Sequence, residues 1–200
     1  MGMGEPTDNQ KAVSKAVEVM VDKQCFALAP SKITISTIAP TPDVFGELAP
    51  LPATLAWSVH AVRDDLRKQL VPTTKYKMEE LKTALIDALQ QRNKRMKATM
   101  LEVTLIDGLN DGVKEAEELA EFSLDIMERV PGIKLVVNLI PFNDIGHATY
   151  RQSSQEAILN FQRVLMSRKV LTYIRITRGD DESAACGQLA TKKRKEMPKP

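Results

Sequence analysis

The sequence is poor in the residues that mark several protein classes. Only two of its 200 residues are cysteine, Cys25 and Cys186, and aromatic residues make up 4% of the chain. Two cysteines so far apart do not form the disulfide framework of a small secreted protein, which predicts a reducing compartment. No apolar run approaches the roughly 20 residues of a membrane span. We therefore expect a soluble monomer with no membrane partner, in the cytoplasm or in an organelle of a eukaryote.

The charge is nearly balanced over the whole chain but is distributed unevenly. Residues 191–200 hold five Lys/Arg and one Glu, a net charge of +4, so the total of +2 leaves −2 for residues 1–190. We expect a basic, disordered tail over 191–200, with nonspecific attraction to phosphates as the alternative. Hydrophobic residues make up 43% of the chain, which is enough to build one core over residues 1–190.

Strand-like and helix-like segments alternate along the chain. Short β-branched or apolar runs predict strands at 33–37, 55–59, 99–106, 134–142 and 170–177. Helical spacing of apolar residues predicts helices at 8–23, 78–92, 111–129 and 154–168. Asp111 is a candidate N-cap of the third helix. The alternation predicts an α/β fold whose parallel strands are joined by right-handed helical crossovers.

Polar motifs fall in the loops that follow the predicted strands, where ligands bind in parallel α/β folds. The loops are 4–9, 36–40, 58–61, 107–111, 141–144 and 177–187. The motif at 4–9 has the composition of a strand-to-helix turn, although no predicted strand precedes it. We therefore expect that residue 1 is not the natural start.

Taken singly, these motifs leave alternatives open. Glu5 follows glycines in a turn that either lets a ligand approach closely or only reverses the chain. His60 either faces a cofactor or is a hydrogen-bonded structural histidine. Neither His60 nor His147 has metal-ligand spacing to other His or Cys, so we expect no metal ligands in this chain.

The two cysteines differ in their surroundings. Cys25 lies in a KQCFALA stretch, where burial as a small hydrophobe is expected. Cys186 lies between alanines and a glycine, whose small side chains would let a bulky reactant come close. An inert thiol remains the alternative there, because reactivity depends on pKa and exposure.

Taken together and in this order, the motifs resemble the radical S-adenosylmethionine (SAM) adenine methyltransferases of ribosomal RNA, the RlmN/Cfr type. The matches are MGMGEP at 1–6, ST at 36–37, SVHA at 58–61, NDG at 110–112, NLIPFN at 138–143, RGDD at 178–181 and AACGQLA at 184–190. The resemblance implies the carboxyl-terminal part of a partial (β/α) TIM-type barrel of the radical SAM kind, truncated at its amino terminus.

The resemblance also implies roles for individual residues. It makes Cys186 the methyl-carrying catalytic residue. The positions that would hold SAM are Gly4, Glu5, Ser36, Ser58, Val59, His60 and Asn143. In such proteins one SAM methylates the cysteine, and a second is cleaved reductively to a 5′-deoxyadenosyl radical that takes hydrogen from the S-methyl group. The methylene radical then adds to an adenine carbon that is not nucleophilic enough to attack SAM directly.

The implied reaction is methylation of adenine carbon 2 in large-subunit ribosomal RNA. Transfer RNA as a second substrate and carbon 8 as the target both remain open. Family members also use a 4Fe-4S cluster held by a C-x-x-x-C-x-x-C loop and a reductant such as flavodoxin or ferredoxin. This sequence contains no such loop, so we expect the chain alone to be inactive.

Two other functions compete with this interpretation. The first is a cluster-less, shortened homologue that binds RNA or a partner without chemistry. The second is an ordinary barrel enzyme that acts on a phosphorylated metabolite, which the loop arrangement alone allows. The second alternative leaves the AACGQLA setting of Cys186 without an explanation.

Overall fold

A computed structural model describes residues 4–143 and 149–175 of the chain. Its centre is a parallel sheet whose five strands lie in chain order, β1-β2-β3-β4-β5. The strands are β1 (Thr34–Thr37), β2 (Thr54–Ser58), β3 (Ala98–Leu105), β4 (Lys134–Pro141) and β5 (Thr172–Ile174). Each strand pairs with the next one in the sequence, as in a barrel that winds in one direction. The predicted α/β fold with parallel strands is confirmed.

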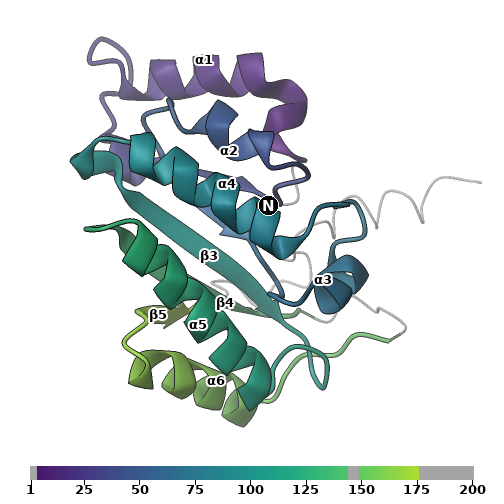
Figure 1. The fold of residues 1–200 in the computed structure, drawn as a ribbon. Coiled ribbons are helices and arrows are strands. Elements are labelled where there is room, and N and C mark those ends of the chain that lie inside the picture. The colour runs from purple at the N-terminus through teal and green to yellow at the C-terminus, as the bar shows by residue number, and fades with distance from the viewer. Residues whose placement is uncertain (1–3, 144–148, 176–200) are drawn as a thin grey trace, which may run out of the picture.

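Helices connect the strands and cover one face of the sheet. They are α1 (Gln10–Val21), α2 (Asp43–Leu48), α3 (Asp64–Leu70), α4 (Met78–Gln91), α5 (Val113–Arg129) and α6 (Gln155–Ser167), with 3-10 turns η1 (Pro6–Asn9), η2 (Pro30–Lys32) and η3 (Lys94–Met96). Figure 1 shows α4 and α5 in front of β3, with α1 and α2 beside α4 and α6 beside α5. None of the helices in the described residues is long and apolar enough to cross a membrane.

The core lies between the sheet and these helices. Alternate strand residues such as Trp57, Leu101 and Val137 are fully buried there, because successive side chains of a strand point to opposite faces. The Trp57 ring packs against Phe45 of α2 at 5.3 Å and Phe122 of α5 at 5.8 Å between ring centroids. Trp57 therefore packs against both α2 and α5 on the helix-covered face of the sheet.

Several details differ from the sequence predictions. The helix expected at 8–23 is divided into η1 and α1, and the short helices α2 and α3 were not predicted. The N-cap of α5 is Gly112 and not Asp111, because the Asp111 carboxylate instead accepts the Gly108 N–H at 3.0 Å within the preceding turn. Cys25 is exposed and not buried, since α1 ends at Val21 and the cysteine lies in the turn beyond it.

Two of the predicted features belong to the carboxyl-terminal part of the chain. The basic tail at 191–200 and the loop that carries Cys186 lie outside the described residues.

Candidate functional site

Glu5 is bound to the carboxyl end of β1. Its carboxylate accepts hydrogen bonds from the Thr37 hydroxyl at 2.6 Å, the Ile38 N–H at 3.0 Å and the Thr7 hydroxyl at 3.1 Å. Gly4 precedes it with a φ of 96°, a conformation that favours glycine, and open space surrounds the position of a Cβ. The segment before η1 is thus held on the sheet, with room beside Gly4 for a ligand.

Arg67 of α3 joins the loops that follow β1 and β2. Its guanidinium is buried and donates to the carbonyl oxygens of Ser58 at 2.9 Å, Ile38 at 2.5 Å and Val59. The guanidinium also lies 5.5 Å from the ring centroid of Trp57, in cation–π contact. Burial lowers the pKa of Arg67 to about 10, which leaves it charged at neutral pH. Both peptide groups that flank the Ile38 Cα are therefore held, the first by Glu5 at the Ile38 N–H and the second by Arg67 at the Ile38 carbonyl.

His60 and Asn110 join the loops that follow β2 and β3. His60 has a φ of 58°, and its Nδ1 accepts the Thr104 N–H at 3.1 Å. The Asn110 amide donates to the carbonyls of His60 and Thr104, each at 2.8 Å, while its oxygen accepts the Ile106 N–H at 2.7 Å. The pKa of His60 is lowered to about 4, mainly because the ring is buried and to a lesser extent because of the positive charge of Arg67. The ring is therefore neutral at pH 7, and its proton lies on Nε2 because Nδ1 accepts a hydrogen bond.

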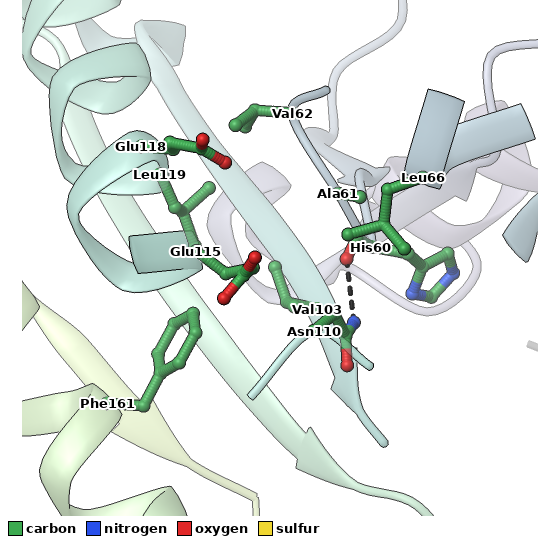
Figure 2. A pocket seen from close by; sticks show the side chains of 10 residues that line it. All are labelled: His60, Ala61, Val62, Leu66, Val103, Asn110, Glu115, Glu118, Leu119 and Phe161. Carbon is green, nitrogen blue, oxygen red and sulfur yellow. Dashed lines mark hydrogen bonds between the residues drawn. The ribbon is translucent and has the colours of Figure 1, made fainter. Parts of the chain in front are cut away.

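The pocket beside His60 is too small for a cofactor. It lies between this loop and the helices α5 and α6, and Figure 2 shows the imidazole pointing away from Glu115 and Glu118. Both carboxylates pair with Arg63, at 3.0 and 3.3 Å. The cavity measures about 10 Å³, room for no more than one water molecule. We interpret it as a packing gap between the loop after β2 and the helices.

The inner face of the sheet, opposite the helices, carries polar side chains. Ser58, Glu102 and Asn138 occupy the same level of β2, β3 and β4 and alternate with core residues such as Trp57 and Leu101. Barrel interiors are normally filled with branched apolar side chains. Hydroxyl, carboxylate and amide groups at this position can instead bind a polar molecule that lies across the strand ends.

The candidate residues predicted from the sequence reach this region in different ways. Ser36 lies on the inner face and donates to Glu102 at 2.9 Å. The Val59 side chain is buried in the core, its N–H donates to Glu102 O at 2.9 Å, and its carbonyl accepts from Arg67. Asn143 is exposed in the loop just after β4. Glu5, Ser36, Ser58 and His60 are thus close to the carboxyl ends of β1 and β2, whereas Cys186 lies outside the described residues.

Sequence reasoning missed two residues of this region. Arg67 stands in the charged stretch DDLRKQL, which is typical of an exposed helix, and nothing in the sequence predicts that it is buried. Glu102 did give a signal, because it is the single charged residue in the apolar strand TMLEVTLI. A charge within such a strand is rare unless it is paired.

An iron–sulfur cluster does not fit the residues present. Among residues 4–143 and 149–175, no group of three or more His, Cys, Asp or Glu side chains is placed to hold a metal ion. The sequence has only Cys25 and Cys186, which are 161 positions apart (186 − 25), whereas such clusters need several neighbouring thiolates.

Known proteins resemble this chain over nearly its whole length. No protein-family model matches it. The dual-specificity RNA methyltransferase RlmN of Ruthia magnifica subsp. Calyptogena magnifica is 38% identical over 193 residues, which are 96% of this chain and 52% of that protein. A radical SAM methyltransferase from Sphaerobacter thermophilus has a solved structure with a TM-score of 0.79 and 35% identity, over 94% of this chain and 53% of that one.

A more distant match concerns the fold alone. A domain of a pyruvate-formate lyase-activating enzyme from Bacteroides vulgatus ATCC 8482 has a TM-score of 0.63 and 15% identity, over 86% of this chain and 95% of that domain. The chain spans about half the length of the two methyltransferases that it matches.

Proposed function

Because the chain is a homologue of RlmN-type radical SAM methyltransferases over about half of their length, we propose that it is the SAM-binding and cysteine-bearing part of an RNA adenine methyltransferase. The observation that carries the proposal is the polar inner face formed by Ser58, Glu102 and Asn138, in a chain 38% identical to an RNA methyltransferase. In this proposal residues 1–190 form the carboxyl-terminal part of a radical SAM partial barrel, and residues 191–200 form a basic tail.

The proposed substrate is RNA. The name of the Ruthia relative describes a dual-specificity RNA methyltransferase. For the present chain we propose adenine carbon 2 of large-subunit ribosomal RNA as the target, with transfer RNA as the second substrate. An adenine presented to this surface must leave its stack, which the small side chains around Cys186 would accommodate.

The residues of the site fit SAM. Its methionine amine and ribose hydroxyls need acceptors, and Glu5, Ser36 and Glu102 offer oxygen atoms near the strand ends. Gly4 has no side chain, and the open space at its Cβ position would let the ligand approach the backbone closely. When bound, SAM supplies the carbon that is transferred.

The chain's own residues hold and orient this ligand in the proposal. Arg67 and Asn110 fix the loops after β1, β2 and β3, so that the positions of Ser58 and His60 are set before a ligand arrives. The neutral His60 keeps one N–H donor, at Nε2. Cys186 is the proposed methyl carrier, because adenine carbon 2 needs covalent delivery of the new carbon. The cluster ligands would lie outside these 200 residues.

The proposal is tested first by sequencing the transcript upstream of residue 1 and then in the protein that the complete reading frame encodes. An in-frame C-x-x-x-C-x-x-C upstream of residue 1 supports the enzyme. Produced in a bacterial strain that lacks its own adenine carbon 2 methyltransferase, that protein should introduce 2-methyladenosine into ribosomal RNA, as measured by mass spectrometry of nucleosides. Cys186→Ala should abolish formation of 2-methyladenosine and spare cluster assembly. The matched control Cys25→Ala should still form 2-methyladenosine, because Cys25 is exposed beyond α1. Methylation by the Cys186→Ala variant would remove the carrier role.

A second candidate function is a non-catalytic protein that binds RNA or a partner. The lack of a C-x-x-x-C-x-x-C loop in these 200 residues favours it. A transcript with a stop codon in frame just before Met1 would support this function and exclude the enzyme.

A further inference from the structure

Glu102 is a buried carboxylate in the central strand of the sheet. Its side chain is 7% exposed, and its neighbours Leu101 and Val103 belong to the core on the helix side. A buried carboxylate is costly unless hydrogen bonds or charges compensate it. The inner face must therefore supply its partners.

The partners present occupy only part of its accepting capacity. Oε2 accepts the Ser36 hydroxyl at 2.9 Å. Oε1 lies 3.8 Å from Nη1 of Arg175, too far for a hydrogen bond, and the Arg175 side chain is 61% exposed. A carboxylate has about four lone-pair positions. Glu102 thus has a nearby positive charge but accepts only one short hydrogen bond among the described residues.

Glu5 does not offer the same capacity. Its carboxylate accepts three hydrogen bonds, from Thr7, Thr37 and Ile38, and holds the amino-terminal segment on β1. Counted over the part of the chain that the structure describes, Glu102 has more acceptor positions to spare than Glu5. It also has Ser58 and Asn138 at its own level on the two neighbouring strands.

We propose that Glu102 is a cofactor-positioning residue that accepts hydrogen bonds from the ribose hydroxyls of SAM, and that Ser36 orients its carboxylate. This inference rests on the proposed function. Because Arg175 already supplies a positive charge, what Glu102 lacks within residues 4–143 and 149–175 is short donors rather than a countercharge. Two neighbouring hydroxyls supply such donors, as they do to the acidic residue of dinucleotide-binding folds.

The test measures ligand binding and needs no catalytic turnover. The 200-residue chain is titrated by calorimetry with S-adenosylhomocysteine, which has the ribose but no sulfonium charge, and with its 2′,3′-dideoxy counterpart. The unmodified chain should bind the first compound about tenfold more tightly than the second. Glu102→Gln should weaken binding of the first compound about tenfold and leave binding of the second unchanged.

Two further variants make the test specific. Ser36→Ala should lower affinity for S-adenosylhomocysteine by a smaller factor, because the carboxylate remains but loses its orienting hydroxyl. Glu115→Gln is the matched control, since Glu115 pairs with Arg63 beside α5 and should leave both affinities unchanged. Thermal unfolding of each variant confirms that it is folded, and the comparison of the two ligands on the unmodified chain does not depend on any variant.

The outcomes separate this inference from the proposed function. If the unmodified chain binds both compounds with equal affinity, the ribose role of Glu102 is wrong. The same holds if Glu102→Gln weakens binding of both compounds equally or of neither. In each of these cases a SAM site remains supported. If the unmodified chain binds neither compound at millimolar concentration, the SAM site in this chain is wrong, and the role of Glu102 is overturned with it.

Discussion

The two faces of the sheet follow different rules. The face toward the helices carries Trp57, Leu101 and Val137, all fully buried, whereas the inner face carries Ser58, Glu102 and Asn138 at one level. Burial of apolar area accounts for the first set, because it stabilises the fold directly. Burial does not account for the second set, since polar groups cost free energy when they leave water. Stability therefore does not explain the residue types of the inner face, whereas the proposed SAM site would explain them.

The largest expected effect is on the helix-facing side. Trp57→Ala removes a fully buried ring that contacts Phe45, Phe122 and the guanidinium of Arg67. The free energy of unfolding, measured with urea, should fall by about 3–5 kcal/mol. A loss below about 1 kcal/mol would contradict the view that this face carries the stability.

Arg67→Met tests the connection between the loops that follow β1 and β2. The change leaves the carbonyls of Ile38, Ser58 and Val59 without their donor, so we expect a loss of about 3 kcal/mol in urea unfolding. Arg67→Lys is the control, and it should recover only part of the loss because one ammonium cannot reproduce the planar fork of donors. Full recovery by lysine would show that charge alone matters at this position.

His60 should make stability depend on pH. Its folded pKa of about 4 lies below the ordinary value of 6.5, so its contribution is present above pH 6.5 and is lost as the pH falls toward 4. The free energy of unfolding should fall by about 2 kcal/mol more in the unmodified chain than in His60→Asn between pH 7 and pH 4.5. Asparagine is a fair replacement because it tolerates the positive φ at this position. Equal pH profiles would contradict the buried, neutral state of the ring.

The smallest expected effect is on the inner face. Among residues 4–143 and 149–175, the Asn138 amide donates only to Met100 Sδ at 3.4 Å, a weak hydrogen bond. Asn138→Ala should therefore change the free energy of unfolding by about 0.5 kcal/mol or less in the same urea titration. A loss as large as that of Trp57→Ala would remove the distinction between the two faces.

The sequence predicted the framework better than the site. The strand at 99–106 and the helix at 78–92 match β3 and α4 to within one residue at each end, because their apolar periodicity is strong over their length. The helices α2 and α3 have six and seven residues, too few for a periodicity to show. The bonds of Arg67 and the left-handed backbone of His60 depend on contacts between distant segments. A local pattern cannot show such contacts.

The two peptide groups that flank Ile38 have a consequence for how fast the proposed ligand would bind. The Ile38 N–H is bonded to Glu5, and the Ile38 carbonyl, which belongs to the next peptide plane, is bonded to Arg67, so two consecutive peptide groups connect the amino-terminal segment to α3. The loops after β1 and β2 are therefore already ordered before a ligand binds. The conformational entropy that such loops would otherwise lose on ligand binding has already been lost during folding. An arriving molecule therefore encounters a surface that needs little rearrangement, and its association rate should be set by diffusion and access rather than by loop closure.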